Sequence, residues 1–395
     1  MDYKFPAATK AKLERWFAIA AGVSGLVGIA WVIFDTKHFL LSYLTAFVFV
    51  VSIGTGAFGW LLIQYLVKSS WAQPFRRIME HLASPLIVGF ILSLPVLIGV
   101  AWMYSWYTAS PEADKLYAHK EPFLNLPFFL VRNVIYLGVW TWFVWRFRKS
   151  SIDQDTAPDF LLTSRLRQLA PVALILLGLT MTFAAFDWIM SLEFHWYSNI
   201  FGVYFWAGGL LNSLAATTVV ALLLRRFEGF DKVITVEHLH DLGRLMFGFT
   251  QFWAYIAFSQ YLLIWYANIP EETMWFIHRI KGSWKFVSIL LLVGHFIIPF
   301  GVLLTRRAQR SPQMLMISAI WLLVMHWIDL YWQVFPSAYP AGIDFRFSEV
   351  IALVFVLSLT GWIVLRSMSE HSLIAMGELR LSQHSQTSVA EGVSR

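Results

Sequence analysis

The chain has 395 residues, of which 58% are hydrophobic and only 14% charged, and its mean hydropathy is +0.61. A soluble protein of this length has about a quarter of its residues charged, so the composition predicts a polytopic membrane protein. The lack of cysteine excludes disulfides, thiolate-bound iron–sulfur clusters, attached c-type haem and thiol catalysis for this chain, and the net charge of +6 matters mainly through its distribution.

The first residues, MDYKFPAATKAKLERW, lack the apolar core and the small-residue cleavage site of a secretory signal. We therefore expect residues 1–15 to form a cytoplasmic segment and the first apolar helix to act as its own insertion signal.

Ten apolar stretches follow, each long enough to cross a hydrocarbon core of ~30 Å as a helix. The seventh begins with Asp241 and Arg244, so only its later part needs to face lipid. The sequence thus predicts an all-α integral membrane protein whose ten-helix domain covers residues 16–366. The expected spans are 16–34, 41–66, 84–107, 127–147, 169–192, 200–224, 242–266, 284–304, 314–335 and 347–366.

The distribution of Lys and Arg predicts the direction of the spans. If the N-terminus is cytoplasmic, 22 of the 30 basic residues fall in the tails and loops of that side, in clusters such as RFRK (146–149) and TRRAQR (305–310). Because cytoplasmic loops are enriched in Lys and Arg, we expect both termini to be cytoplasmic. The polar, Ser-rich residues 367–395 are expected to form a cytoplasmic tail that is disordered or lies on a partner.

One outward loop, ANIPEETMWFIHRIKGSW (267–284), mixes charges with aromatic residues. This pattern favours an interfacial helix with Trp275, Phe276 and Trp284 at the level of the lipid headgroups, and a docking surface is the alternative.

The fifth and ninth spans resemble each other. TFAAFDWIMSLEFHWYS and LLVMHWIDLYWQVFPSAYP both run outward and both hold a Trp-Ile pair beside a carboxylate. An offset of four helices preserves direction, which predicts two four-helix bundles, spans 2–5 (about 41–192) and 6–9 (about 200–335), with spans 1 and 10 peripheral.

Few ionisable residues lie inside the spans. A charged side chain at the centre of a membrane helix costs roughly 2.5–3.5 kcal/mol, so such residues should face the bundle interior and be hydrogen-bonded. His326 and Asp329 lie about one helical turn apart and share a face. Carboxylic acids alongside imidazoles can relay protons near neutral pH. The predicted relay comprises Asp187, His295, His326, Asp329 and Glu349.

Further polar residues are candidate supports for this relay. Gln251, Tyr255, Gln260 and Tyr261 on the seventh span are supporting or quinone-site candidates, and Glu193 and His195 are a candidate outlet. The candidates for proton access from the cytoplasm are Glu237, His240, Asp241 and Arg244.

Several alternatives remain open from the residues alone. The buried polar residues can serve as hydrogen-bonding contacts between helices without any proton chemistry. His295 and His326 can be read as axial ligands of a single b-type haem, and the helix count also fits a secondary transporter, although paired broken helices are lacking. No metal site is predicted from the sequence.

Three stretches carry a resemblance to a known family. FDWIMSLEFHWYSNIFGVYFWAGG (186–209), FGFTQFWAYIAFSQYLLIWYANIPEETMWF (247–276) and HWIDLYWQVFP (326–336) resemble the NrfD-like membrane subunits of bacterial alternative complex III, a quinol:electron-acceptor oxidoreductase. The family also includes the polysulfide reductase membrane subunit, and its members are built from two four-helix bundles.

The resemblance implies a function and partners. The family complex contains two such subunits, and the length and short tails here are more similar to the shorter one, which is assigned proton transfer or a structural role; the longer, quinol-oxidising type is the alternative. The implied partners are the sister subunit, an extracytoplasmic iron–sulfur protein, multihaem and monohaem c-type cytochromes and small membrane subunits, all in the bacterial cytoplasmic membrane. Quinol is a possible ligand, while haem c and iron–sulfur clusters are expected in the partners.

Overall fold

The computed structural model describes residues 3, 5–69, 71–157 and 159–375. Helices are the only regular secondary structure among these residues, which confirms the all-α prediction. Of the predicted tail 367–395, residues 367–370 continue the last helix and residues 376–395 lie outside the described part of the chain.

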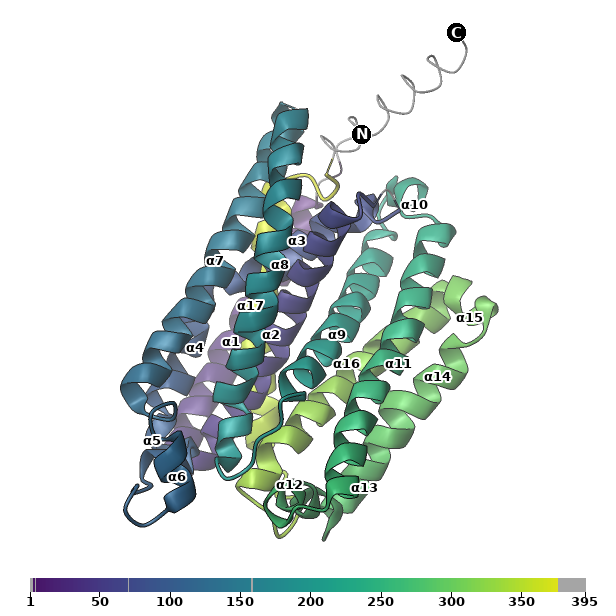
Figure 1. Ribbon diagram of the computed structural model, residues 1–395. Helices are drawn as coiled ribbons and strands as arrows, with labels where there is room; N and C mark the ends of the chain where they lie inside the picture. The colour runs from purple at the N-terminus through teal and green to yellow at the C-terminus, as the bar shows by residue number, and fades with distance from the viewer. Residues whose placement is uncertain (1–2, 4, 70, 158, 376–395) are drawn as a thin grey trace.

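Long helices run side by side from one end of the molecule to the other (Figure 1). We call the end that carries the short helices α10 (Phe230–Val233) and α15 (Arg306–Arg310) the α10 end. The opposite end, which carries α6 (Lys115–Lys120) and α12 (Pro270–Ile280), is called the α6 end.

The long segments alternate in direction between these ends. In chain order they are α1 (Ala7–Phe34), α2 (Thr36–Leu66), α3 (Gln73–Ala83) with η1 (Ser84–Val88), α4 (Gly89–Ile98) and α5 (Val100–Met103), α7 (Leu126–Thr156), α8 (Phe160–Trp188), α9 (Phe201–Leu224), α11 (Val236–Ala267), α13 (Trp284–Leu290) with η4 (Leu291–Ile297) and α14 (Ile298–Leu303), α16 (Pro312–Val334) and α17 (Phe347–Glu370). The short connecting turns are η2 (Ser105–Tyr107), η3 (Met190–Glu193) and η5 (Phe335–Ser337).

Within the described residues, nine helical segments are long and apolar enough to cross a membrane, which establishes a multi-span membrane protein. The tenth predicted span, α11, is 32 residues long but does not reach the same apolar character. Its first turns carry Glu237, Asp241 and Arg244, and Gln251 and Gln260 follow further along.

The largest differences from the predicted starts occur in three helices, which begin 9 to 11 residues earlier than the sequence predicts. α1 begins at Ala7, α3 at Gln73 and α8 at Phe160, because amphipathic turns rich in good helix formers continue beyond the apolar run. In α3 the extra turns carry charged residues whose side chains face inward, so hydropathy alone places the start of this span too late.

The span of α13 and α14 contains a π-helical segment, η4, directly before Pro299. Proline lacks the N–H that would bond to the carbonyl of His295, four residues earlier. The wider hydrogen-bonding pattern, in which the N–H of Ile298 bonds to the carbonyl of Val293, accommodates this loss.

α2 and α9 form the central contact of the molecule. A Cβ atom added to Gly56 of α2 would lie 2.2 Å from the carbonyl oxygen of Gly209 of α9, so the two backbones approach too closely for any side chain at that position. Trp60 of α2 donates from Nε1 to the carbonyl of Leu210 across this contact, at 3.1 Å. α8 and α16 each pack against both central helices, and α1 packs mainly on α17 at the periphery.

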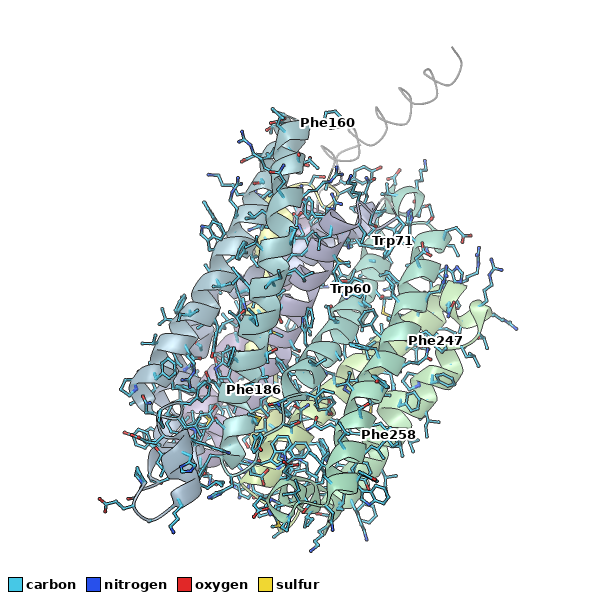
Figure 2. The ribbon with its side chains drawn as sticks, in the orientation of Figure 1. Trp60, Trp71, Phe160, Phe186, Phe247 and Phe258 are labelled. Carbon is cyan, nitrogen blue, oxygen red and sulfur yellow. The ribbon has the colours of Figure 1, made fainter. Side chains whose placement is uncertain are left out.

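Large apolar side chains cover the outer surface of the long helices. Ile33 of α1, Leu26 of α1 and Ile175 of α8 are each more than 60% exposed. Phe258 of α11 lies on the outward side, whereas Trp60 is buried between helices (Figure 2). A surface this apolar is stable against lipid rather than water.

Candidate functional site

Asp329 of α16 is the centre of a buried polar cluster. Its side chain is 1% exposed, and each carboxylate oxygen accepts a hydrogen bond from a different helix. The hydroxyl of Tyr204 on α9 donates to Oδ1 at 2.5 Å, and Nε1 of Trp253 on α11 donates to Oδ2 at 3.3 Å. The carboxylate is therefore fixed between three helices.

His326 lies one turn earlier on α16 and is also 1% exposed. Its Nε2 lies 3.0 Å from the hydroxyl of Ser52 on α2, and that hydroxyl donates its proton to the carbonyl of Phe49 at 2.7 Å. We therefore assign the proton of the imidazole to Nε2, which leaves Nδ1 as an acceptor. A Cβ at Gly208 would lie 2.7 Å from the ring, so this glycine makes room for His326.

His295, on the π-helical segment, joins this cluster through ring packing. Its centroid lies 3.9 Å from that of Trp253 and 6.3 Å from that of His326. Both of its ring nitrogens are buried without a hydrogen-bond partner among the described residues. Together, His295, His326 and Asp329 with Ser52, Tyr204 and Trp253 form what we call the α16 cluster, so the structure brings together three members of the predicted relay.

Asp187 belongs to a separate site. It is fully buried on α8 and forms a two-pronged ion pair with Arg132 of α7, with Nε–Oδ2 and NH2–Oδ1 distances of 2.8 and 2.7 Å. The hydroxyl of Tyr136 also donates to Oδ2, at 2.8 Å. Within the described part of the chain no hydrogen bond links this ion pair to the α16 cluster. The expectation of one relay through Asp187 and Asp329 is therefore not met by direct contacts.

Glu349 also has its own partner. Its Oε1 lies 3.0 Å from Nε2 of the fully buried His38 at the start of α2, and the other ring nitrogen lies 3.1 Å from the hydroxyl of Tyr339. Glu349 also accepts from the backbone N–H of Arg346 and thereby caps its own helix. The pair ties the beginning of α2 to the beginning of α17.

Glu193, a predicted outlet residue, anchors α12 at the α6 end. Its carboxylate bonds to His278 at 2.5 Å, to NH1 of Arg279 at 3.2 Å and to the hydroxyl of Ser337 at 3.5 Å. Arg279 is fully buried, and desolvation lowers its pKa to about 10 while the Glu193 carboxylate opposes that fall. This network ties the predicted outlet residue Glu193 to α12 and to η5.

The aromatic residues of the same loop are also more enclosed than predicted. α12 forms as expected, but Trp275 is 3% exposed and Trp284 is fully buried. Both side chains face the protein interior rather than its surface, because Trp275 stacks on Trp196 with centroids 4.5 Å apart and Trp284 donates to the carbonyl of Tyr339.

The second outlet residue, His195, remains at the surface. Its side chain is 59% exposed and pairs with Asp114 at 2.6 Å. The cytoplasmic access candidates are also superficial: Arg310 pairs with Glu237, which is 65% exposed, and Arg244 lies 3.8 Å from Asp241. His240 lies 4.0 Å from Glu237. Glu237 and Arg244 are more than half exposed, whereas His240 is 13% exposed, and all four residues take part in ion pairs at the α10 end.

Three of the four candidates on α11 point away from the bundle. Gln251 and Tyr261 are exposed and Tyr255 is 66% exposed, while Gln260 is 3% exposed. Gln251 and Tyr255 share a helix face as expected, but the inward face is the one that carries Trp253 and Gln260. The predicted quinone-site set is therefore not assembled, and its residues do not fit a quinone headgroup inside the bundle.

Sequence reasoning missed the direct partners of the carboxylates, above all Arg132, His38, Tyr204 and Trp253. Arg132 lies near the start of the predicted fourth span and His38 lies just before the predicted second span, so neither interrupts the middle of an apolar run. A basic side chain one or two turns inside an apolar run is the signal that would have identified Arg132 as a partner of a buried acid.

A cavity of about 240 Å³ lies at the α6 end, where residues from both halves of the chain meet. Its lining includes Lys37 of α2, Tyr104 and Ser105 beyond α5, Leu192 of η3 and Ser337 of η5. Ser337 also bonds to Glu193, so the cavity lies beside the α12 network.

The α16 cluster does not fit a haem. Trp253 packs directly on His295, and Nε2 of His326 is held by Ser52, so side chains occupy the space that a porphyrin would need. In the described ranges, no three His, Asp or Glu side chains are arranged to hold a metal ion.

No family model matches the chain, and no curated protein matches it either.

Proposed function

We propose that the chain is a proton-transferring membrane subunit of a quinol:electron-acceptor oxidoreductase of the alternative complex III type. The α16 cluster carries this proposal: an acid and two imidazoles, all at most 1% exposed, meet inside a bundle of apolar helices. Burying such groups is costly, and in membrane proteins they mark ion pathways and proton relays.

The cluster has the properties that a proton relay needs. Asp329 is held in a fixed orientation by two donors, and the acceptor nitrogen of His326 and the ring nitrogens of His295 have no bonding partner among the described side chains. Nitrogens in this state can accept and release a proton without first breaking a bond to the protein. Within the proposed subunit, they pass protons along α16 toward the α6 end.

The outer part of the path is the cavity at the α6 end and the Glu193 network beside it. The cavity reaches the last turn of α16 through Val334 and Ser337, and the hydroxyl of Ser337 bonds to Glu193. Glu193 is the outlet in this proposal, while the exposed His195 is assigned no step.

The finer architecture is part of the same proposal. We take α11 as a tenth span, since it is long enough and packs on α9 and α14. The helices from α2 to α8 and from α9 to α16 then form two four-helix bundles, and α1 and α17 are peripheral. α2 packs on α8 as α9 packs on α16, and α2 packs on α16 as α9 packs on α8. These matching contacts support a repeat in which α9 corresponds to α2 and α16 corresponds to α8.

The proposed setting is the bacterial cytoplasmic membrane, with both termini and the α10 end cytoplasmic, as the Lys and Arg distribution favours. The resemblance of residues 186–209, 247–276 and 326–336 to NrfD-like subunits supports a place among the membrane subunits of the complex, and we propose the shorter, ActF-type position for this chain. Quinol oxidation and electron transfer would take place in the sister subunit, the iron–sulfur protein and the c-type cytochromes.

The direct test is Asp329→Asn in the assembled complex reconstituted into vesicles, with quinol oxidation and proton release measured together. Positioned proton-transfer groups contribute roughly 100- to 10,000-fold, so we expect turnover or proton release to fall at least tenfold. Asp241→Asn at the α10 surface is the matched control and should leave both unchanged. If Asp329→Asn also leaves both unchanged, the proposal is wrong.

A further inference from the structure

A second buried cluster of titratable residues lies toward the α10 end, away from the α16 cluster. It is formed by Arg77, Glu80 and His81 of α3 and Ser151 of α7, each at most 1% exposed, and we call it the α3 cluster. α3 lies at this end of the molecule (Figure 1), which Trp71 and Phe160 mark in Figure 2. The predicted relay includes none of these four residues.

Hydrogen bonds and ion pairs hold the cluster together. NH2 of Arg77 donates to the carbonyl of Ser151 at 3.2 Å and to Asp155 at 2.8 Å, and Nε of Arg77 lies 3.5 Å from Glu80. His81 bonds through Nδ1 to the hydroxyl of Ser367 on α17, at 2.7 Å. The side chains thus converge from α3, α7 and α17.

Apart from the Arg77–Glu80 ion-pair contact, many polar atoms of this cluster have no hydrogen-bond partner among the described residues. The hydroxyl of Ser151 lies beside Glu80 but lacks the geometry of a hydrogen bond. Among the described residues, the unpartnered buried atoms here are Oε1 and Oε2 of Glu80, Nε and NH1 of Arg77, Nε2 of His81 and Oγ of Ser151.

Such a concentration of unpartnered buried groups is not stable in a dry site. Nearly all buried polar groups in proteins are bonded to protein or to ordered water. Donors and acceptors are mixed here: the Glu80 carboxylate disfavours an anion and the Arg77 guanidinium disfavours a cation. Water is the ligand that can donate to Glu80 and accept from Arg77 at the same time.

The cluster also has a link to the aqueous phase. Asp155, which accepts from Arg77, is 18% exposed near the end of α7. The charged groups that face Glu80 and His81 are Arg76 and Arg77 from α3, Arg148 from α7, and His371, which follows α17.

We propose that the α3 cluster is a water-filled chamber through which Glu80 and His81 exchange protons with the aqueous phase at the α10 end. The ligand is water and the hydrated proton. Whether the chamber takes up or releases protons depends on the proposed function. In a proton-transferring subunit the chamber is the site of proton uptake, in place of the surface ion pairs around Glu237.

The first test uses the absence of cysteine from the chain. Ser151→Cys is compared with Ser213→Cys in the assembled complex, using a small water-soluble methanethiosulfonate as the probe and the mass of this chain as the readout. Ser213 is the matched control, because it is fully buried at the α2–α9 contact and its hydroxyl bonds to the carbonyl of Leu210 at 2.9 Å. Because thiol modification follows exposure to water, we expect Ser151→Cys to react at least about tenfold faster. Equal rates would overturn the proposal.

The second test is Glu80→Gln, which keeps the shape of the side chain and removes its titratable proton. We expect proton uptake at the α10 end to slow about tenfold, as for loss of a positioned proton-transfer group. Rapid labelling of Ser151→Cys in the same background shows that the chamber is still formed. Unchanged proton uptake in that background would overturn the proton-exchange role.

The two proposals fail in different ways. If Asp329→Asn has no effect but Ser151→Cys reacts rapidly, the proposed function is wrong and the hydrated chamber stands. If Asp329→Asn blocks proton release while Ser151→Cys and Ser213→Cys are equally inert, the chamber is wrong and the function stands.

Discussion

Asp329 and Asp187 occupy similar places on α16 and α8, but their partners give them different roles. Asp187 is paired with the Arg132 guanidinium, whereas the Asp329 carboxylate accepts hydrogen bonds from the neutral donors Tyr204 and Trp253. An arginine partner stabilises the charged form of a carboxylate through its charge and two hydrogen bonds, whereas neutral donors supply no opposite charge. We therefore assign Asp187 a structural role and Asp329 the chemical one.

The structural role of Asp187 predicts a specific pattern of stability. Arg132→Met leaves a buried carboxylate without its counter-ion, and breaking a buried pair in this way costs about 3–5 kcal/mol. The double variant Arg132→Met/Asp187→Asn removes both charges and should recover most of that loss. The measurement is the thermal unfolding midpoint and yield of the purified complex, and a double variant no better than the single would contradict this assignment.

The neighbours of a polar residue in the sequence decide whether its place in a buried site can be predicted. Asp187, His295, His326 and Asp329 stand out because each interrupts a long apolar run. Helical spacing places Gln251 and Tyr255 on one face but does not say which face points inward, and α11 carries aromatic residues on both faces. The α3 cluster was missed because its charged residues lower the local hydropathy and resemble a solvated loop.

At the scale of helices, small residues decide how closely the central pair can pack. Gly56 and Gly209 let α2 and α9 approach until their backbones are in direct contact. In a membrane, where lipid removes the hydrophobic drive between helices, this close packing is a main source of association.

This packing predicts different effects for two neighbouring glycines of α2. A Cβ at Gly56 would lie 2.2 Å from the Gly209 carbonyl oxygen, so Gly56→Ala must push the helices apart. We expect a loss of about 1–3 kcal/mol, as for overpacking of a core, measured as a lower unfolding midpoint. A Cβ at Gly59 would make an ordinary contact of 3.5 Å with Leu210, so Gly59→Ala is the control. Equal effects of the two substitutions would contradict the close α2–α9 contact.

The apolar runs predict the existence of the long helices, but less reliably their limits. Helices α7 and α8 extend at the α10 end into charged, amphipathic turns that lie outside the apolar runs of the sequence. The π-helical segment depends on Pro299, whose position in the sequence indicates a distortion without specifying its form. The resemblance between spans five and nine predicts a repeat of four helices, and this repeat stays a prediction.

At the scale of the whole molecule, the α3 cluster lies toward the α10 end and the Glu193 network lies at the α6 end. The distribution of Lys and Arg predicts that the α10 end is cytoplasmic.

Single cysteines introduced into this cysteine-free chain test the direction. Glu237→Cys at the α10 end and His195→Cys at the α6 end both replace side chains that are more than half exposed. In intact cells, a membrane-impermeant thiol reagent should label His195→Cys and spare Glu237→Cys until the cells are opened. The reverse pattern would contradict the proposed orientation.

The most direct measurement for the central claim is a double-mutant cycle on the α16 cluster, with protons released per quinol oxidised and turnover as readouts. If His326 and Asp329 act as one relay, His326→Gln and Asp329→Asn each lower turnover or proton release about 10- to 100-fold, and the double variant is no worse than the more damaging single. Losses that multiply in the double variant, or single variants that leave both readouts unchanged, would show that the two residues do not form a common proton path.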